Sequence, residues 1–281
     1  MRWLVTGCRG MLGQDLLEVL EGRGEQVTGI DQEDLDITDP GATAGAAAGY
    51  DIVVNCAAYT AVDRAEEEEA SAFAVNAVGA ANLARAARTA RARMVQISTD
   101  YVFDGDARDP YPADAAIAPR SAYGRTKAAG EWAVRAGCRE HLIVRTAWLY
   151  GAHGPCFPRT IARAARERGT LDVVADQMGQ PTWTVDLADL VVRLVVAGVP
   201  SGIYHGTASG HTSWHGFARV VVGAAGLDEE LVRPTTSSEY VRAAARPSYS
   251  VLAHDSVSAA GVAPIGPWDE RWRRAAAAVL G

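Results

Sequence analysis

Short apolar runs alternate with amphipathic segments through the first half of the chain. Five runs, at residues 2–7, 26–31, 51–58, 93–99 and 141–146, carry aliphatic residues at both odd and even positions. Runs of this length that are apolar on both faces are typical of strands buried inside a parallel sheet. We therefore predict one buried strand at each run.

Helical patterns separate the predicted strands. Residues 11–24 repeat leucine at helical spacing and end in two glycines, and a longer helical pattern runs from about Glu66 to Ala90. Strands that alternate with helices form parallel sheets through right-handed crossovers. The sequence thus predicts an α/β fold, a Rossmann-type doubly wound parallel sheet with helices on both faces.

This regularity fades beyond about residue 150. A helix is expected around 159–169, a loop at 176–184 and an apolar helix at 185–198, with no Gly/Ser/Pro linker before them. We assign residues 1–150 to the sheet domain and residues 151–281 to a smaller C-terminal lobe, from which some segments return to the sheet. A ligand is expected between the two, beyond the carboxyl ends of the strands.

Composition and charge narrow the class of partner. The 281 residues carry a net charge of −7 and no dense Lys/Arg cluster, so a small molecule is a better candidate ligand than a nucleic acid. No apolar run approaches the roughly 20 residues that span a bilayer, and the expected location is cytoplasmic. The four cysteines are far apart without a Cys-x-x-Cys pair, so we expect reduced thiols and no metal.

Three glycines follow the first predicted strand directly. Gly7, Gly10 and Gly13 stand between that strand and the first helix, in a G-x-x-G-x-x-G spacing. Glycines at this position let the backbone turn tightly and approach a pyrophosphate, whose charge is stabilised by amides at the helix N-terminus. The position favours a dinucleotide site.

Two residues bear on which dinucleotide binds. Asp31 ends the second predicted strand, where a carboxylate accepts hydrogen bonds from the adenosine ribose hydroxyls, which favours NADH. Arg9 lies within the glycine loop and is placed to meet a 2′-phosphate, which favours NADPH. The preference between NADH and NADPH therefore stays open. Further residues are candidates for lining the cofactor: Asp36, Ile37, Ala57 and Ala58.

Tyr123 and Lys127 stand four positions apart in an Ala-rich helical segment. Residues at this spacing share one helix face about 6 Å apart. A nearby ammonium stabilises a phenolate and lowers the pKa of the phenol, most effectively in a partly desolvated site. The fourth predicted strand ends in Thr99 at the same sheet edge, where its hydroxyl can orient a carbonyl oxygen.

Together these features resemble the extended short-chain dehydrogenase/reductase family. Within it, the segments "NCAAYTAVDRAE", "STDYVFDG", "YGRTKAAGE", "VRTAWLYG", "DQMGQPTWTVDLA" and "RPSYSVL" are similar to the dTDP-4-dehydrorhamnose reductases, and the match extends over nearly the whole chain. The resemblance implies NAD(P)H-dependent reduction of the C4 ketone of dTDP-4-dehydro-6-deoxy-L-mannose to dTDP-L-rhamnose. One departure is the tail after "RPSYSVL", which lacks a Lys-Leu pair often found in the family.

The resemblance also implies a role for each site residue. Tyr123 donates a proton to the ketone oxygen, Thr99 hydrogen-bonds that oxygen or the phenol, and Lys127 binds the nicotinamide ribose and lowers the Tyr123 pKa. Residues 1–150 would bind NAD(P), with Met11, Leu12 and Tyr59 added to the cofactor set, and residues 151–281 would mainly bind the sugar nucleotide. The substrate set comprises Thr60, Val62, Thr99, Asp100, Tyr101, Tyr123, Trp148, Gln180, Pro181, Thr182 and Arg246, the last at the diphosphate.

Several alternatives remain at this point. The sequence also allows a 4-ketoreductase for another dTDP-deoxysugar in specialised metabolism, and relatives of the fold include non-catalytic regulatory subunits that bind the cofactor. A dehydratase or epimerase would use Asp100 as an acid. The oligomeric state, monomer or homodimer, is open. The acidic run from Glu66 to Glu69 is expected to be a solvated helix start, and His211 and His215 lack a third ligand for zinc.

Overall fold

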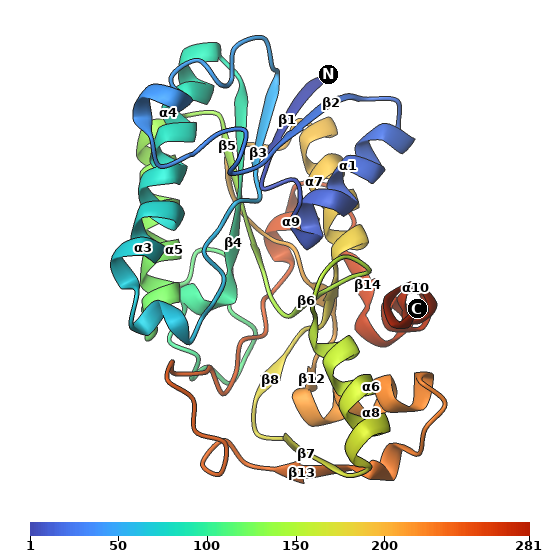
Figure 1. Ribbon diagram of the computed structural model, residues 1–281. Coiled ribbons are helices and arrows are strands. Elements are labelled where there is room, and N and C mark those ends of the chain that lie inside the picture. Colours follow the sequence, from blue (N-terminus) through green and yellow to red (C-terminus); the bar gives the residue numbers. More distant parts are fainter.

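A six-stranded parallel sheet forms the centre of the computed structural model, which describes residues 1–281 (Figure 1). The strand order is β10-β5-β4-β3-β1-β2, and every neighbouring pair is parallel. Five of these strands are the predicted ones. Their bounds are β1 (Arg2–Thr6), β2 (Gln26–Ile30), β3 (Ile52–Asn55), β4 (Arg93–Thr99) and β5 (His141–Thr146), with β10 (Gly202–His205) at the edge.

Helices cover both faces of the sheet, which confirms the predicted doubly wound fold. Alternate residues of β1 point to opposite faces, so Trp3 and Val5 enter one core while Leu4 enters the other. The first core packs against α1 (Met11–Gly22) and α7 (Thr184–Val196), with α9 (Asp255–Ala259) beside them. The second packs against α4 (Ala80–Ala90) and α5 (Ala122–Gly137), near the short α2 (Pro40–Thr43).

The long helix predicted from about residue 66 to residue 90 is divided into four pieces. These are the 3-10 turn η1 (Arg64–Glu66), α3 (Glu69–Phe73), the π-helical stretch η2 (Ala74–Gly79) and α4. Within η2, the buried Asn76 side chain accepts from the Tyr59 amide at 2.9 Å and donates to the Thr126 hydroxyl at 3.0 Å. The π-helical stretch therefore carries an amide that joins the loop after β3 to helix α5.

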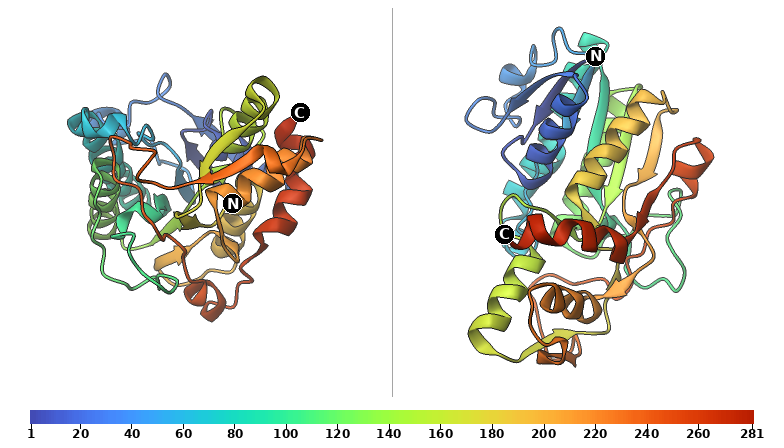
Figure 2. Two further views of the ribbon diagram at one scale, coloured as in Figure 1. Left: turned by 90° about the horizontal axis from the view of Figure 1, so that it is seen from below. Right: turned by 90° about the vertical axis from the view of Figure 1, so that its right-hand side faces the viewer.

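The C-terminal lobe lies beyond the carboxyl ends of the strands. Helices α6 (Phe157–Arg168), α8 (Trp214–Ala224) and α10 (Trp268–Leu280) pack around Tyr150, Phe217 and Trp272. In the right-hand view of Figure 2, α10 runs across the molecule between the sheet domain and the pair α6 and α8. The lobe also contains four short strand pairs: β6 (Leu149–Tyr150) with β9 (Thr182–Trp183), β7 (Leu171–Val174) with β13 (Val232–Thr235), β8 (Met178–Gly179) with β12 (Thr212–Ser213), and β11 (Ala208–Ser209) with β14 (Ile265–Pro267).

Several chain segments tie the lobe to the sheet domain. Chain segments after residue 180 return to the sheet as α7 and β10. Residues 236–247, which we name the strap, follow β13 and run back from the lobe toward the sheet domain (Figure 1). At its end the Tyr249 amide donates to the Gly105 carbonyl at 2.9 Å, and Ser248 Oγ donates to the same carbonyl. The elements η3 (Asp100–Val102) and η4 (Glu229–Leu231) complete the fold.

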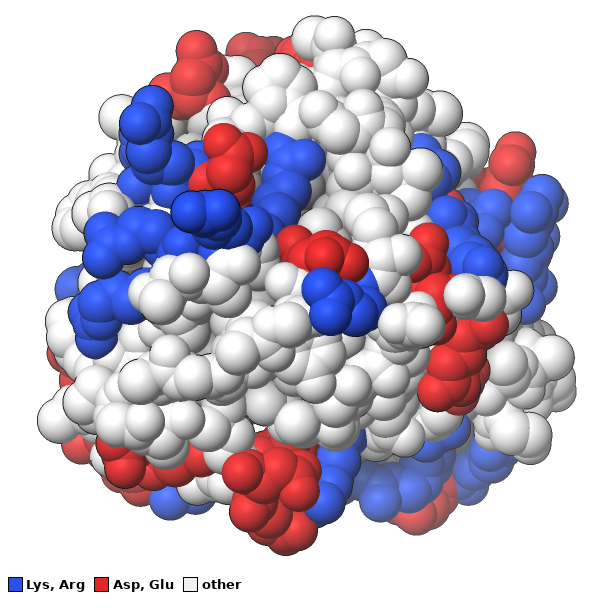
Figure 3. Space-filling view, turned by 90° about the horizontal axis from the view of Figure 1, so that it is seen from above, with Lys and Arg blue, Asp and Glu red and all other residues white.

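Two surface properties bear on possible partners. None of the helices is both long enough and apolar enough to cross a membrane. On the face shown in Figure 3, basic side chains form separate groups at the left and right of the view, and acidic side chains stand among and around them. This face is not uniformly basic.

Candidate active site

A cavity of about 1100 Å³ lies between the carboxyl ends of the central strands and the C-terminal lobe. Its wall contains the glycine loop after β1, the ends of β2, β3 and β4, the first turns of α5, and the indoles of Trp148 and Trp214. Pockets for one small ligand are roughly 300 to 1,000 Å³. The cavity therefore has room for a dinucleotide and a second molecule beside it.

The glycine loop is shaped for close approach by a pyrophosphate. Gly7 has a φ of +69°, and a Cβ on Gly7 would lie 2.5 Å from the Ala57 nitrogen. A Cβ on Gly13 would lie 2.3 Å from the Gly7 oxygen. Helix α1 begins at Met11 without a side-chain cap or an acidic residue in its first turn, which leaves its amides free to bind an anion. These residues fit the pyrophosphate of a nicotinamide dinucleotide.

Both residues that bear on the choice of dinucleotide line the cavity. Asp31 Oδ2 accepts from the Arg9 amide at 2.9 Å, and the Arg9 guanidinium donates to Glu33 at 2.5 Å and lies 3.9 Å from Asp34. The carboxylate suited to a ribose hydroxyl and the guanidinium suited to a 2′-phosphate are thus adjacent. The other expected cofactor residues that line the same cavity are Gly10, Met11, Leu12, Asp36, Ile37, Ala57, Ala58 and Tyr59.

The structure brings Thr99, Tyr123 and Lys127 to one wall of this cavity. Thr99 ends β4, and the other two side chains project from the first two turns of α5. Lys127 Nζ donates to the Ile97 carbonyl of β4 at 2.6 Å, and only 5% of the residue is exposed. Helix α5 begins here because the Ser121 hydroxyl accepts from the Gly124 amide at its N-cap.

Burial dominates the ionisation of the pair. It raises the pKa of Tyr123 to about 12, while contact with Thr99 acts in the opposite direction. It lowers the pKa of Lys127 to about 8, while the Glu131 carboxylate acts in the opposite direction. Desolvation is the largest influence on the Tyr123 phenol, so its net pKa is raised, and the lowering of this pKa by Lys127 stays a prediction. A phenol with a raised pKa is protonated at neutral pH and can serve as a proton donor.

Lys127 is the only lysine in the chain, and every other strongly basic side chain is an arginine. An ammonium is a compact charge whose pKa shifts on burial, whereas a guanidinium stays charged and needs more space. The presence of a single lysine among many arginines is therefore a sequence signal that marks position 127 as a candidate functional residue. One turn further along α5, the buried Glu131 accepts two hydrogen bonds from Arg145, at 2.9 and 2.8 Å, and one from Ser98 at 2.6 Å.

Asp100 lies directly behind Thr99. The Thr99 hydroxyl donates to Asp100 Oδ1 at 2.9 Å, and the carboxyl is almost fully buried. Burial raises the pKa of Asp100 to about 6. A carboxyl group without a cationic partner is thus held at the cavity wall next to the Thr99 hydroxyl.

The aromatic part of the wall comes from both lobes. Trp148 has a φ of +48°, which is unusual for a residue other than glycine, and its indole stacks on Trp214 with ring centroids 3.5 Å apart and an interplanar angle of 7°. Trp214 begins α8 in the segment "HTSWH", where sequence reasoning considered only the histidines. Three more of the expected substrate residues line the cavity: Thr60, Val62 and Tyr101.

Four expected substrate residues do not reach this cavity. The Gln180 side chain is buried and forms two hydrogen bonds with the backbone of Leu252, at 3.2 and 2.8 Å, so it secures the loop instead of facing a ligand. Pro181 and Thr182 are also buried away from the cavity. Arg246 donates to Asp63 at 2.8 Å and lines a small neighbouring pocket beside Tyr101. Gln180, Pro181 and Thr182 therefore do not line the cavity as expected, whereas contact between Arg246 and the substrate diphosphate stays a prediction.

Comparison with known proteins agrees with this arrangement. Residues 1–280 match the model of the family described as RmlD substrate binding domain. The chain belongs to the RmlD family. A probable dTDP-4,6-dihydroxy-2-methyloxan-3-one 4-ketoreductase from Streptomyces antibioticus is 46% identical to it over 98% of this chain and 94% of that protein's own length.

Two further proteins are similar to this chain over nearly its whole length. A dTDP-4-keto-6-deoxy-D-glucose reductase from Streptomyces niveus is 47% identical over 95% of this chain and 93% of its own length. A crystal structure of the dTDP-4-dehydrorhamnose reductase of Bacillus anthracis in complex with NADP has a TM-score of 0.94 and 37% identity, and the match covers 98% of each chain. The fold of this RmlD family member is thus shared over its full length.

Proposed function

We propose that this chain is an NAD(P)H-dependent reductase of the C4 ketone of a dTDP-4-dehydro-6-deoxyhexose, and that its substrate is dTDP-4-dehydro-6-deoxy-L-mannose, which it converts to dTDP-L-rhamnose. The observation that carries the proposal is the convergence of Thr99, Tyr123 and Lys127 on the cavity that the glycine loop also lines. The names of the three relatives supply the dTDP-sugar and the reaction at its ketone.

The cofactor would be held by the first part of the chain. The amides of the first turn of α1 would bind the pyrophosphate, and Asp31 and Arg9 would face the adenosine ribose. Lys127 would hold the nicotinamide ribose hydroxyls. When bound, the reduced nicotinamide supplies the hydride.

The chain's own residues would manage the proton. Hydride addition to a ketone carbon leaves an alkoxide, which is a stronger base than a phenolate. Tyr123, which is protonated at neutral pH, would pass its proton to that oxygen, and the Thr99 hydroxyl would orient the oxygen or the phenol. The Lys127 ammonium would then stabilise the phenolate until it is protonated again. The stacked indoles of Trp148 and Trp214 would exclude water from the sugar.

A second candidate substrate is another dTDP-4-keto-deoxysugar of specialised metabolism. Two of the relatives, at 46 and 47% identity, are named for sugars other than the rhamnose precursor. The same proton donor and the same cofactor site would serve such a sugar. The difference would lie in the part of the wall formed by Thr60, Val62 and Trp148.

Product identification tests the proposal. Purified protein is incubated with enzymatically prepared dTDP-4-dehydro-6-deoxy-L-mannose, and in parallel with other dTDP-4-keto-deoxysugars, each with NADH or NADPH. Loss of the reduced-nicotinamide absorbance with one equivalent of dTDP-L-rhamnose is the expected result. Turnover of a different sugar alone would favour the second candidate, and a lack of turnover with every sugar would favour a cofactor-binding regulatory role.

A further inference from the structure

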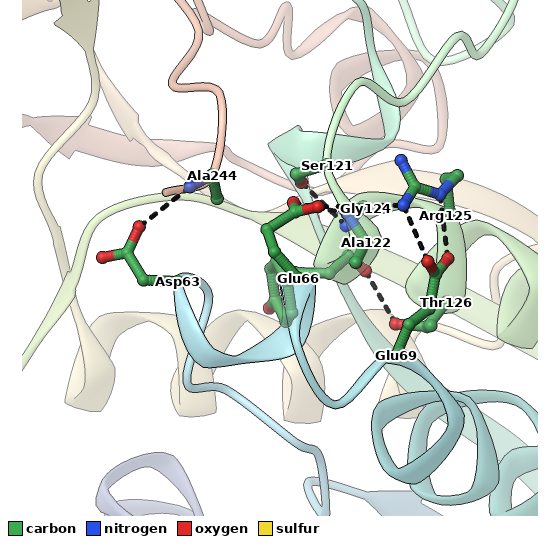
Figure 4. Close-up of polar contacts among 10 residues, drawn as sticks. Asp63, Glu66, Glu69, Ser121, Ala122, Gly124, Arg125, Thr126 and Ala244 are labelled. Carbon is green, nitrogen blue, oxygen red and sulfur yellow. Dashed lines mark hydrogen bonds and ion pairs between the residues drawn. The ribbon is translucent and has the colours of Figure 1, made fainter. Parts of the chain in front are cut away.

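The acidic residues after the loop of β3 lie against the helix that carries Tyr123 and Lys127. We name residues 63–69 the acidic segment. It comprises η1 and the start of α3, and Figure 4 shows its side chains directed toward the first turn of α5 and toward Ala244 of the strap. The sequence favours a solvated helix start for Glu66 to Glu69. The structure overturns that interpretation, because three of the four carboxylates have defined partners.

Glu66 holds the amide that precedes Tyr123. Its Oε1 accepts from the Ala122 nitrogen at 2.8 Å, and Ala122 is the first residue of α5. The Glu66 side chain is only 26% exposed. A carboxylate at a helix N-terminus satisfies an amide that the helix cannot, and it complements the positive end of the helix dipole. The contact therefore fixes the first turn of α5 at the point from which the phenol projects.

Further hydrogen bonds hold the first turn of α5 and the loop after β3 from other sides. Glu69 accepts two hydrogen bonds from Arg125, at 2.9 and 2.8 Å, on the outer side of the same turn (Figure 4). Glu68 accepts from the Tyr59 hydroxyl at 2.8 Å, and Tyr59 lines the cavity. The acidic segment thus forms hydrogen bonds with α5, which carries the proposed proton donor, and with Tyr59 of the loop after β3, which lines the cavity.

The same segment also holds the strap. Asp63 accepts from the Ala244 amide at 3.2 Å and from the Arg246 guanidinium at 2.8 Å. The C-terminal lobe is thereby attached to the sheet domain within three residues of Glu66. The strap and the first turn of α5 thus both make hydrogen bonds to this one short segment of chain.

We propose that Glu66 is a positioning residue for the reduction, which sets the distance between the Tyr123 phenol and the reacting oxygen by holding the Ala122 amide. The inference rests on the proposed function of Tyr123. Glu66 does not line the cavity, and it would act on the reaction only through the position of α5. Glu67 is a matched control, because it has the same charge, is exposed, and forms no side-chain hydrogen bond or ion pair.

The first test compares Glu66→Ala, Glu66→Gln and Glu67→Ala. Misplacement of a reacting group by about 1 Å can cost roughly a hundredfold in rate, so we expect Glu66→Ala to lower kcat about tenfold or more. The KM for the sugar and the directly measured Kd for the reduced cofactor should stay within about twofold. Glu66→Gln should restore most of kcat, because its amide oxygen still accepts from Ala122. Glu67→Ala should behave as wild type.

Hydrogen exchange gives a readout that does not depend on turnover. The amides of residues 122–126 should exchange faster in Glu66→Ala and at the wild-type rate in Glu66→Gln and Glu67→Ala. Should Glu66→Ala not fold, Glu66→Asp is used instead in both measurements, because it retracts the carboxylate by one methylene. Unchanged exchange, or a kcat loss shared by Glu67→Ala, would overturn the inference. If the wild type reduces no 4-keto sugar, the proposed function fails, and the exchange result alone decides the role of Glu66.

Discussion

Lys127 Nζ donates a hydrogen bond of 2.6 Å to the carbonyl oxygen of Ile97, which places the chain's only ammonium side chain between α5 and the strand that ends at Thr99. The bond fixes the long side chain although no carboxylate pairs with it directly. Burial there lowers the pKa of Lys127 to about 8. The charge of Lys127 is therefore sensitive to pH near neutrality.

The single lysine makes that pKa directly measurable. Protein labelled with ¹³C at lysine Cε should give one side-chain resonance, and its titration should have a midpoint near pH 8 instead of the ordinary 10.5. Because the proton is bound less tightly in the folded than in the unfolded chain, the free energy of unfolding should rise as the pH increases from about 8 to 10.5. A midpoint above pH 10 would show that the ammonium is solvated and would contradict its burial.

Replacement of Lys127 by arginine tests why this position keeps a lysine. A guanidinium is larger than an ammonium and holds a planar fork of donors, so at this buried position we expect Lys127→Arg to lower kcat/KM by about a hundredfold. Arg135→Lys, on the exposed part of the same helix, is the control for a lysine–arginine exchange. Equal activity of Lys127→Arg and wild type would mean that only a positive charge is needed.

Asp100 should lower stability above pH 6. Its pKa is raised by burial from 3.8 to about 6, so ionisation opposes folding as the pH rises through this interval, and the loss is complete above it. At pH 7.5 Asp100→Asn should therefore unfold at a higher urea concentration than wild type. Its free energy of unfolding should be larger by on the order of 2 kcal/mol at this pH, with little difference near pH 4. The rate of ketone reduction by Asp100→Asn should be lower than that of wild type. A stability difference that does not change with pH would contradict this account.

The stack of Trp148 on Trp214 should govern sugar binding. Trp148 is held at a positive φ, a strained conformation that the surrounding packing must maintain. Trp214→Ala removes the stacked ring, so we expect the KM for the dTDP-sugar to rise about tenfold while the Kd for the reduced cofactor changes little. The excitonic band of two stacked indoles should also disappear from the circular dichroism spectrum. Trp132→Ala, at a side chain that is largely exposed, controls for the general loss of a tryptophan.

Local sequence pattern was sufficient for the sheet and for the catalytic helix. The run at 93–99 became β4 with the predicted bounds, because both of its faces are buried between two layers of helices. Tyr123 and Lys127 fall on one helix face because their spacing of four residues determines it. Even so, the pattern did not show the break at η2, where the Asn76 side chain bonds groups 17 and 50 residues away.

The parts that sequence missed depend on partners far along the chain. Gln180 was expected to face the substrate, but its partner Leu252 is 72 residues away and draws the side chain into the core. Glu66 was expected to be solvated because it belongs to the acidic run at residues 66–69, but its hydrogen-bond partner Ala122 is 56 residues away. In both cases the side chain's role is set by tertiary contact, to which the residue type and its neighbours give no guide.

Transfer of deuterium tests the central claim most directly. The protein is given dTDP-4-dehydro-6-deoxy-L-mannose with NADH or NADPH deuterated at nicotinamide C4 on either face, and the product is examined by mass spectrometry and NMR, with Tyr123→Phe in parallel. The account predicts deuterium at sugar C4 of dTDP-L-rhamnose from one of the two labels, one cofactor oxidised for each product, and a rate about a hundredfold lower in Tyr123→Phe at nearly unchanged cofactor affinity. Product formed without net cofactor oxidation, or full activity of Tyr123→Phe, would contradict it.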